Sequence, residues 1–188
     1  MFKYIMLSIL FFALVVSVAV LAVLYGKSKN EDKPEPPGPG PKVPGLRMMV
    51  KLDDSDFDEY NDTLGMNEKK VKTVQLLGEH YMGIFPTEAE FYINGNKYDF
   101  AKSFDFTEPG TYYIQYRFTK SPFDCSNMFA ECEDIDFIDL STLNTSNTMM
   151  MNNMFSGCRK LTSINFKGID TKMVVMMGGM FRNCARLT

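Results

Sequence analysis

The chain has 188 residues, a formal net charge of -3 and a sequence pI near 5.2. This length allows one or two modest domains, and the acidic balance argues against nucleic-acid binding, which favours a basic face. His80 is the only histidine, which leaves almost no scope for histidine-based metal sites or for Ser-His and Cys-His catalysis. We therefore expect a protein that is not an enzyme and that uses no cofactor.

Residues 1–26 form the first segment, and it is strongly apolar. Within residues 5–25 only Ser8 and Ser17 are polar, and a helix that rises about 1.5 Å per residue would cross the ~30 Å hydrocarbon core of a bilayer. The run predicts a single-pass membrane anchor with the carboxyl side outside the cell. The alternative is a signal peptide cleaved after Ala19, which would leave a secreted protein.

Residues 27–47 contain six prolines and three glycines and almost nothing apolar to bury. Such a composition predicts an extended, polyproline-type stalk. Lys27, Lys29 and Lys33 follow the apolar run, and a count of basic residues alone would place the carboxyl side inside the cell. The orientation of the anchor therefore stays open at this point.

Residues 48–120 read as a small antiparallel β module. Asn-Gly at 94–95 between aromatic runs is a strong hairpin signal. Residues 112–118 alternate with period two, which indicates a half-buried strand. Further strand candidates are residues 47–52 and 71–77. Together they predict a β-sandwich-like module similar to an immunoglobulin-type domain.

Residues 53–62 form an acidic stretch, "DDSDFDEYND". An EF-hand loop that begins at Asp54 would need glycine at its sixth position and glutamate at its twelfth. The sequence has Glu59 and Gly65 there, so the pattern does not match. We expect a solvated acidic loop, and a weak calcium site of another kind is the alternative.

The motif Met-Phe-x-x-Cys occurs three times at a constant spacing. Cys132 and Cys158 are 26 residues apart, and so are Cys158 and Cys184. A fixed period of this length is the signature of stacked repeats, in which "IDFIDL" and "LTSINF" would each supply a short strand. We expect the recurring positions to be structural and to form buried ladders; they are Met128, Phe129, Cys132, Met154, Phe155, Cys158, Met180, Phe181 and Cys184.

Stacking makes specific predictions for single side chains. Phe155 should lie between Phe129 and Phe181. The cysteines should be unpaired, because a ladder gives a line of thiols rather than a tetrahedral metal site; a disulfide between neighbouring layers is the alternative. Lys160 should face solvent, because its counterparts in the other repeats are an aspartate and an arginine.

Residues 121–188, which include "MFSGCRKLTSINFKGIDTKMVVMMGGMFRNCARLT", resemble the BspA-like leucine-rich-repeat surface proteins. Thr148 and Pro122 depart from the pattern, since Val174 shows the apolar residue expected at their position. The resemblance implies a surface-displayed β-solenoid that binds proteins, often as an adhesin toward host or neighbouring cells. It brings no catalytic residues.

These observations predict a mainly β fold. An N-terminal transmembrane helix would precede a β-sandwich-like module and a leucine-rich-repeat-type solenoid of 26-residue coils. The predicted function is a membrane-anchored, surface-displayed protein-binding module; the alternative is a structural cell-envelope protein. The repeats lack a polar capping unit, so we expect the chain to be part of a longer protein.

Overall fold

The computed structural model describes residues 44–57 and 71–188. The described residues form strands joined by turns and two short 3-10 helices. The elements are β1 (Gly45–Leu52), η1 (Asp54–Phe57), β2 (Lys72–Gln75), η2 (Pro86–Glu88), β3 (Ala89–Ile93), β4 (Asn96–Tyr98), β5 (Ser103–Phe106), β6 (Gly110–Phe118), β7 (Ile135–Asp139) and β8 (Ser163–Asn165).

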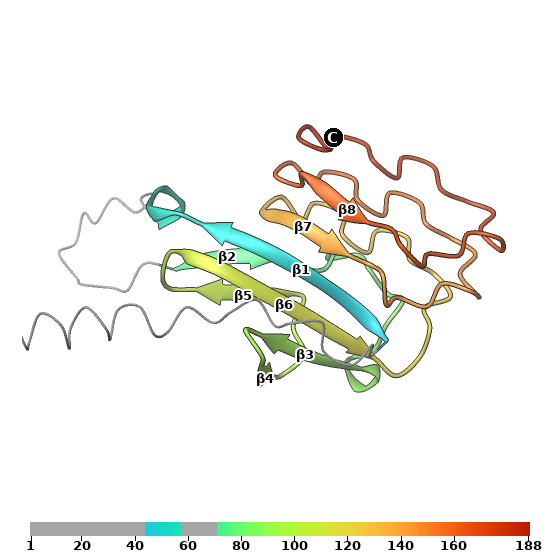
Figure 1. The fold of residues 1–188 in the computed structure, drawn as a ribbon, viewed down its shortest axis with the longest axis horizontal. Coiled ribbons are helices and arrows are strands. Elements are labelled where there is room, and N and C mark those ends of the chain that lie inside the picture. The colour runs from blue at the N-terminus through green and yellow to red at the C-terminus, as the bar shows by residue number, and fades with distance from the viewer. Residues whose placement is uncertain (1–43, 58–70) are drawn as a thin grey trace, which may run out of the picture. The chain divides into compact units, whose positions relative to one another are not determined.

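Six strands form one sheet in the order β4-β3-β6-β1-β7-β8, as Figure 1 shows. The long strand β1 is antiparallel to β6 on one side and to β7 on the other, whereas β7 and β8 run parallel. Strands β2 and β5 form a second, two-stranded antiparallel sheet. Strand β1 therefore joins the β module to the repeats through backbone hydrogen bonds.

The β3–β4 hairpin turns at the predicted residues. Asn94 and Gly95 have φ angles of 48° and 83°, and the tightest hairpin turn needs positive φ at both central positions. Asparagine and glycine adopt such angles at low cost. Asn94 Oδ1 also accepts the Tyr113 N–H at 2.9 Å, which ties the turn to β6. The predicted hairpin is confirmed.

The core lies beneath β6 and β1 and continues into the repeats. Ile114, Tyr116 and Phe118 are buried, which confirms the predicted alternation of β6. Tyr116 stacks on Phe91 with ring centroids 4.9 Å apart. The buried side chains that carry the core from β1 to β7 are Leu46, Met48, Val50, Ile135 and Ile138.

The predicted fold class requires correction. A β-sandwich-like module followed by a leucine-rich-repeat-type solenoid of 26-residue coils was expected. Instead one open sheet runs through both segments, and within the described residues only two repeats contribute a strand, β7 and β8. The reason is that β1 uses both of its edges, so the module and the repeats complete each other's sheet.

The prediction of a membrane-anchored protein also requires correction. Across residues 44–57 and 71–188 the apolar side chains belong to short strands and turns, and no helix there is long and apolar enough to cross a bilayer. The predicted anchor at 5–25 and most of the predicted stalk at 27–47 lie outside the described residues.

Candidate protein-interaction surface

The repeated segments lie directly on one another. The rings of Phe129 and Phe155 stack with centroids 5.4 Å apart and planes at 10°, and those of Phe155 and Phe181 at 5.5 Å and 1°. In Figure 1 these segments form successive layers beside β7 and β8. We call this part of the chain the stack, and its layers are unit 1 (residues 122–147), unit 2 (residues 148–173) and unit 3 (residues 174–188).

The nine predicted ladder residues divide by unit. The six that belong to units 1 and 2 are at most 1% exposed. In unit 3, Met180 and Cys184 are half-buried and Phe181 is 44% exposed. The difference arises because each unit covers the one before it, and within the described residues no layer lies over unit 3.

All four cysteines are free thiols. The Cys158 thiol donates to the Phe129 carbonyl at 3.1 Å, and the Cys184 thiol donates to the Phe155 carbonyl at 3.0 Å. Desolvation raises the pKa of Cys158 to about 12, so its thiolate is scarce at neutral pH and its nucleophilicity is low. The thiols of Cys158 and Cys184 therefore link neighbouring layers as hydrogen-bond donors.

Two further positions recur in register, and the sequence reading missed them. The first is occupied by Asn127, Asn153 and Gly179, and all three have positive φ. A second such position follows four residues later in each unit. Asparagine and glycine tolerate this left-handed conformation best. The recurrence of asparagine or glycine at residues 127, 153 and 179, every 26 positions, was the sequence signal for a tight turn in every layer.

Thr148 and Pro122, the two residues that depart from the repeat pattern, are hydrogen-bonded to each other. Thr148 is fully buried, and its hydroxyl donates to the Pro122 carbonyl at 2.6 Å. Those residues occupy the same position in units 1 and 2, where unit 3 has Val174. The threonine therefore replaces an apolar contact between layers by a satisfied hydrogen bond.

Lys160 does not behave as predicted. Its ammonium lies 3.0 Å from a carboxylate oxygen of both Asp56 and Asp134, and its side chain is 34% exposed. It therefore bridges the stack to η1.

The predicted acidic loop is described only as far as residue 57. No group of three or more metal-ligating side chains exists among the described residues.

An exposed apolar stripe runs across the layers at one register. Phe123 is 56% exposed, Val175 is 69% exposed, and Met149 lies half-buried between them. The Met149 N–H donates to the Phe123 carbonyl at 3.0 Å, and the Val175 N–H donates to the Met149 carbonyl at 2.9 Å. These contacts place the three side chains on successive layers. With Met176, which is 53% exposed, they form what we call the stripe.

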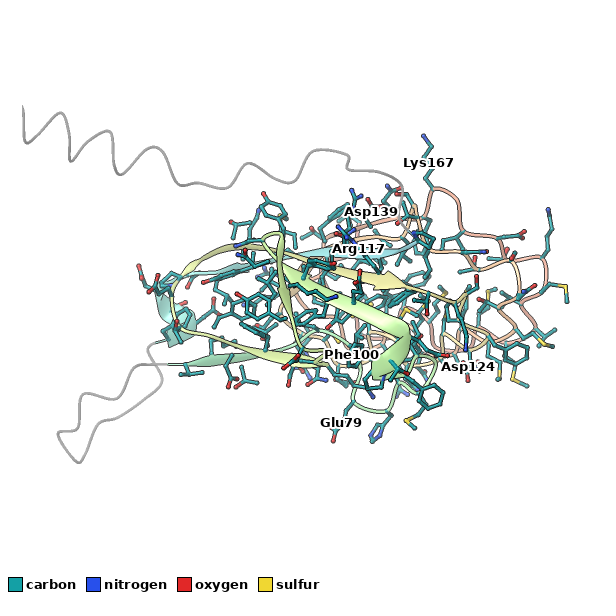
Figure 2. All side chains as sticks on the ribbon, turned by 90° about the horizontal axis from the view of Figure 1, so that it is seen from below. Glu79, Phe100, Arg117, Asp124, Asp139 and Lys167 are labelled. Atoms are coloured by element: carbon teal, nitrogen blue, oxygen red, sulfur yellow. The ribbon has the colours of Figure 1, made fainter. Side chains whose placement is uncertain are left out.

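The surroundings of the stripe are apolar as well. The loop that bears Met82 and Phe85, 74% and 61% exposed, approaches unit 1 where Gly83 lies against the Asp124 carbonyl. In Figure 2, Asp124 lies toward the side of the molecule where many sulfur atoms gather. Asp124 is the only charged residue in the segments 121–126, 147–152 and 173–178.

Comparison with known proteins gives one family match. Residues 116–188 match the family described as "Mycoplasma protein of unknown function, DUF285". The matched segment begins within β6 and includes all three units, and it is less than half of the chain. No curated protein and no solved structure matches the chain. The family match is therefore to the segment that carries the stripe.

Proposed function

We propose that the chain is a protein-binding module of the adhesin type, which attaches to proteins of host or neighbouring cells through the stripe. The observation that carries the proposal is the row of Phe123, Met149 and Val175 on successive layers, in which Phe123 and Val175 are exposed and Met149 is half-buried. Protein-binding surfaces are depleted in charge and enriched in methionine and aromatic residues at their centres. The stripe has that composition.

Methionine gives the surface a further property. Its side chain is unbranched and polarizable, so it adapts to partners of different shape. The resemblance to BspA-like repeat proteins and the DUF285 match both concern the segment that bears these methionines. The resemblance supports a binding role for the repeats rather than for the β module, and the family match gives the extent of the segment concerned.

The test is adhesion of beads that carry the 188-residue protein to cultured animal cells, before and after the cells' surface proteins are removed by protease. We expect the beads to adhere to untreated cells and to lose adhesion after treatment. Val175→Glu and Phe123→Glu should each weaken adhesion by about tenfold or more, because each puts an unpaired charge into an apolar contact.

The matched control is Ser163→Glu, which adds the same charge to an exposed side chain of β8, away from the stripe register. It should leave adhesion unchanged. Equal adhesion to protease-treated cells, or equal losses in all three variants, would refute the proposal and favour a structural role.

A further inference from the structure

The β module contains a small cavity, and every residue that lines it precedes the stack. Its volume is about 160 Å³, and its walls come from the β3–β4 hairpin, β5 and the start of β6. Three of the lining residues, Asn96, Asp105 and Thr107, are exposed, so the cavity opens to solvent. Four others are aromatic; they are Tyr98, Phe104, Phe106 and Tyr112.

The four rings form a curved wall. In chain order, neighbouring rings have centroids 5.2, 5.1 and 4.2 Å apart, and their planes are inclined by 76°, 59° and 46°. The Tyr112 hydroxyl donates to the Glu108 carbonyl at 2.6 Å, which fixes that ring, while Tyr98 remains 41% exposed. A flat ligand, such as a sugar or an aromatic ring, stacks best against parallel rings. Inclined rings suit a compact, rounded group instead.

The charge around the cavity favours a cation. Asp105 is the only charged residue that lines it, and its carboxylate accepts the Thr73 hydroxyl at 2.7 Å. The nearest lysine in sequence, Lys97, does not line the cavity, and its ammonium pairs with Glu90 at 2.7 Å. The faces of aromatic rings also carry negative potential. A positively charged ligand therefore meets attraction from the rings and from the acidic residue.

The chemistry of the wall selects among cations. A primary ammonium has three N–H donors, and each of them needs an acceptor when it leaves water. A quaternary ammonium has no N–H, so its methyl groups can contact rings without leaving a donor unsatisfied, as in aromatic cages. We propose that this cavity binds the trimethylammonium group of a choline-type ligand. The cavity is distinct from the stripe, and the inference does not depend on the proposed function.

The probe is choline, titrated into the 188-residue protein and followed by calorimetry. We expect choline to bind, and its neutral isostere, in which carbon replaces the nitrogen, to bind about tenfold more weakly or less, because the shape is kept and the charge is lost. Tyr98→Ala should weaken choline binding by about fivefold or more, because it removes the most exposed ring of the wall. Tyr98→Phe keeps a ring there and should retain most of the affinity.

The matched control is Tyr113→Ala, which removes a half-buried ring of β6 that does not line the cavity. It should leave choline binding unchanged, and so should Val175→Glu in the stripe. The inference fails if choline does not bind, if the neutral isostere binds equally, or if Tyr98→Ala and Tyr113→Ala have equal effects.

Vesicles separate the two sources of a trimethylammonium group. They are made of phosphatidylcholine or, for comparison, of phosphatidylglycerol, and are sedimented with the parent protein and with Tyr98→Ala. Binding to phosphatidylcholine that Tyr98→Ala selectively weakens would identify a lipid headgroup as the ligand. Choline binding without such a difference on vesicles would identify a soluble ligand.

Discussion

The Phe155 ring contacts three other aromatic rings of the stack. Phe129 and Phe181 stack on its two faces, and Phe166 meets its edge at 5.9 Å with the planes at 90°. Its side chain is fully buried. Phe181 is the same residue type at the same position of the repeat, but only one ring stacks on its faces. A comparison of the two positions therefore shows the effect of burial alone.

We expect Phe155→Ala to lower the free energy of unfolding by about 3–5 kcal/mol, because it opens a cavity between two layers that cannot close over it. Chemical denaturation of the full chain measures the loss. Phe181→Ala is the matched control, and its cost should be much smaller because that ring is 44% exposed. Equal losses would mean that the stack gives Phe155 no special enclosure.

At the residue scale, the repeat period predicts the contacts of some side chains but not of others. The constant spacing of Phe129, Phe155 and Phe181 was enough to foresee that they would stack, because layers in register repeat their contacts. The role of Lys160 was not foreseeable, since its partner Asp56 lies 104 residues away in sequence. A residue that changes sign between repeats can still have a partner outside the repeats.

The contact between η1 and the stack depends on that lysine. Burial tends to raise the pKa of Asp56, but the Asp53 N–H and the Lys160 ammonium stabilise its carboxylate, and the net shift is downward. Burial tends to lower the pKa of Lys160, but hydrogen bonds to Asp56 and Asp134 reverse the direction. Both shifts favour the charged pair in the folded state.

We expect Lys160→Ala to cost about 1 kcal/mol near neutral pH, a value kept small because the pair is partly solvated. Asp56 has a lowered folded pKa, so its contribution is present above its ordinary value of 3.8 and is lost as pH falls through the folded pKa. Lys160 has a raised folded pKa, so its contribution is present below 10.5 and is lost as pH rises through the folded pKa.

Denaturation of the parent chain and Lys160→Ala across pH measures this difference. It should be constant from about pH 5 to pH 9 and shrink outside that window. Arg159→Ala is the matched control, because Arg159 pairs with Glu133 alone among the described residues and its side chain is 66% exposed. A difference that does not change at acidic pH would show that the Asp56 contact adds no stability.

At the element scale, local signals predicted the strands well. The hairpin at Asn94 and Gly95 and the alternation in β6 depend on neighbours in sequence, so one sequence suffices to find them. The order of strands was not predictable, because the pairing of β1 with β7 joins residues about ninety positions apart (Met48 with Ile138). The period of the repeats does not indicate which strand from outside the repeats will pair with β7, the strand of unit 1.

For the whole molecule, the shared sheet implies that the β module and the stack support each other. Strand β1 pairs with β6 along its whole length and with β7 over residues 47–50. The Gly78 N–H donates to the Met128 carbonyl at 2.8 Å, so the loop at Gly78 covers that side of unit 1. Repeat arrays need such a cover at their ends, because an unpaired layer exposes its interior. The module therefore acts as the first cap of the stack.

We expect one cooperative unfolding transition for the module and the stack. The chain contains its own two probes, because all four cysteines lie in the stack and no tyrosine lies between residues 121 and 188. Tyrosine fluorescence then reports the part of the chain before residue 121, which includes the module, and alkylation of the cysteines during denaturation reports the stack. The two midpoints should coincide.

Ile138→Ala, a change at a buried position of β7, should lower the free energy of unfolding by about 2–5 kcal/mol. It should shift both signals equally, because β1 pairs with both β7 and β6 and a weaker β7 therefore destabilises the whole sheet. Lys167→Ala, at an exposed position, should shift neither. Thiols that react at lower denaturant while the tyrosine signal is unchanged would show two independent domains, and the sheet through β1 would then add nothing to their cooperativity.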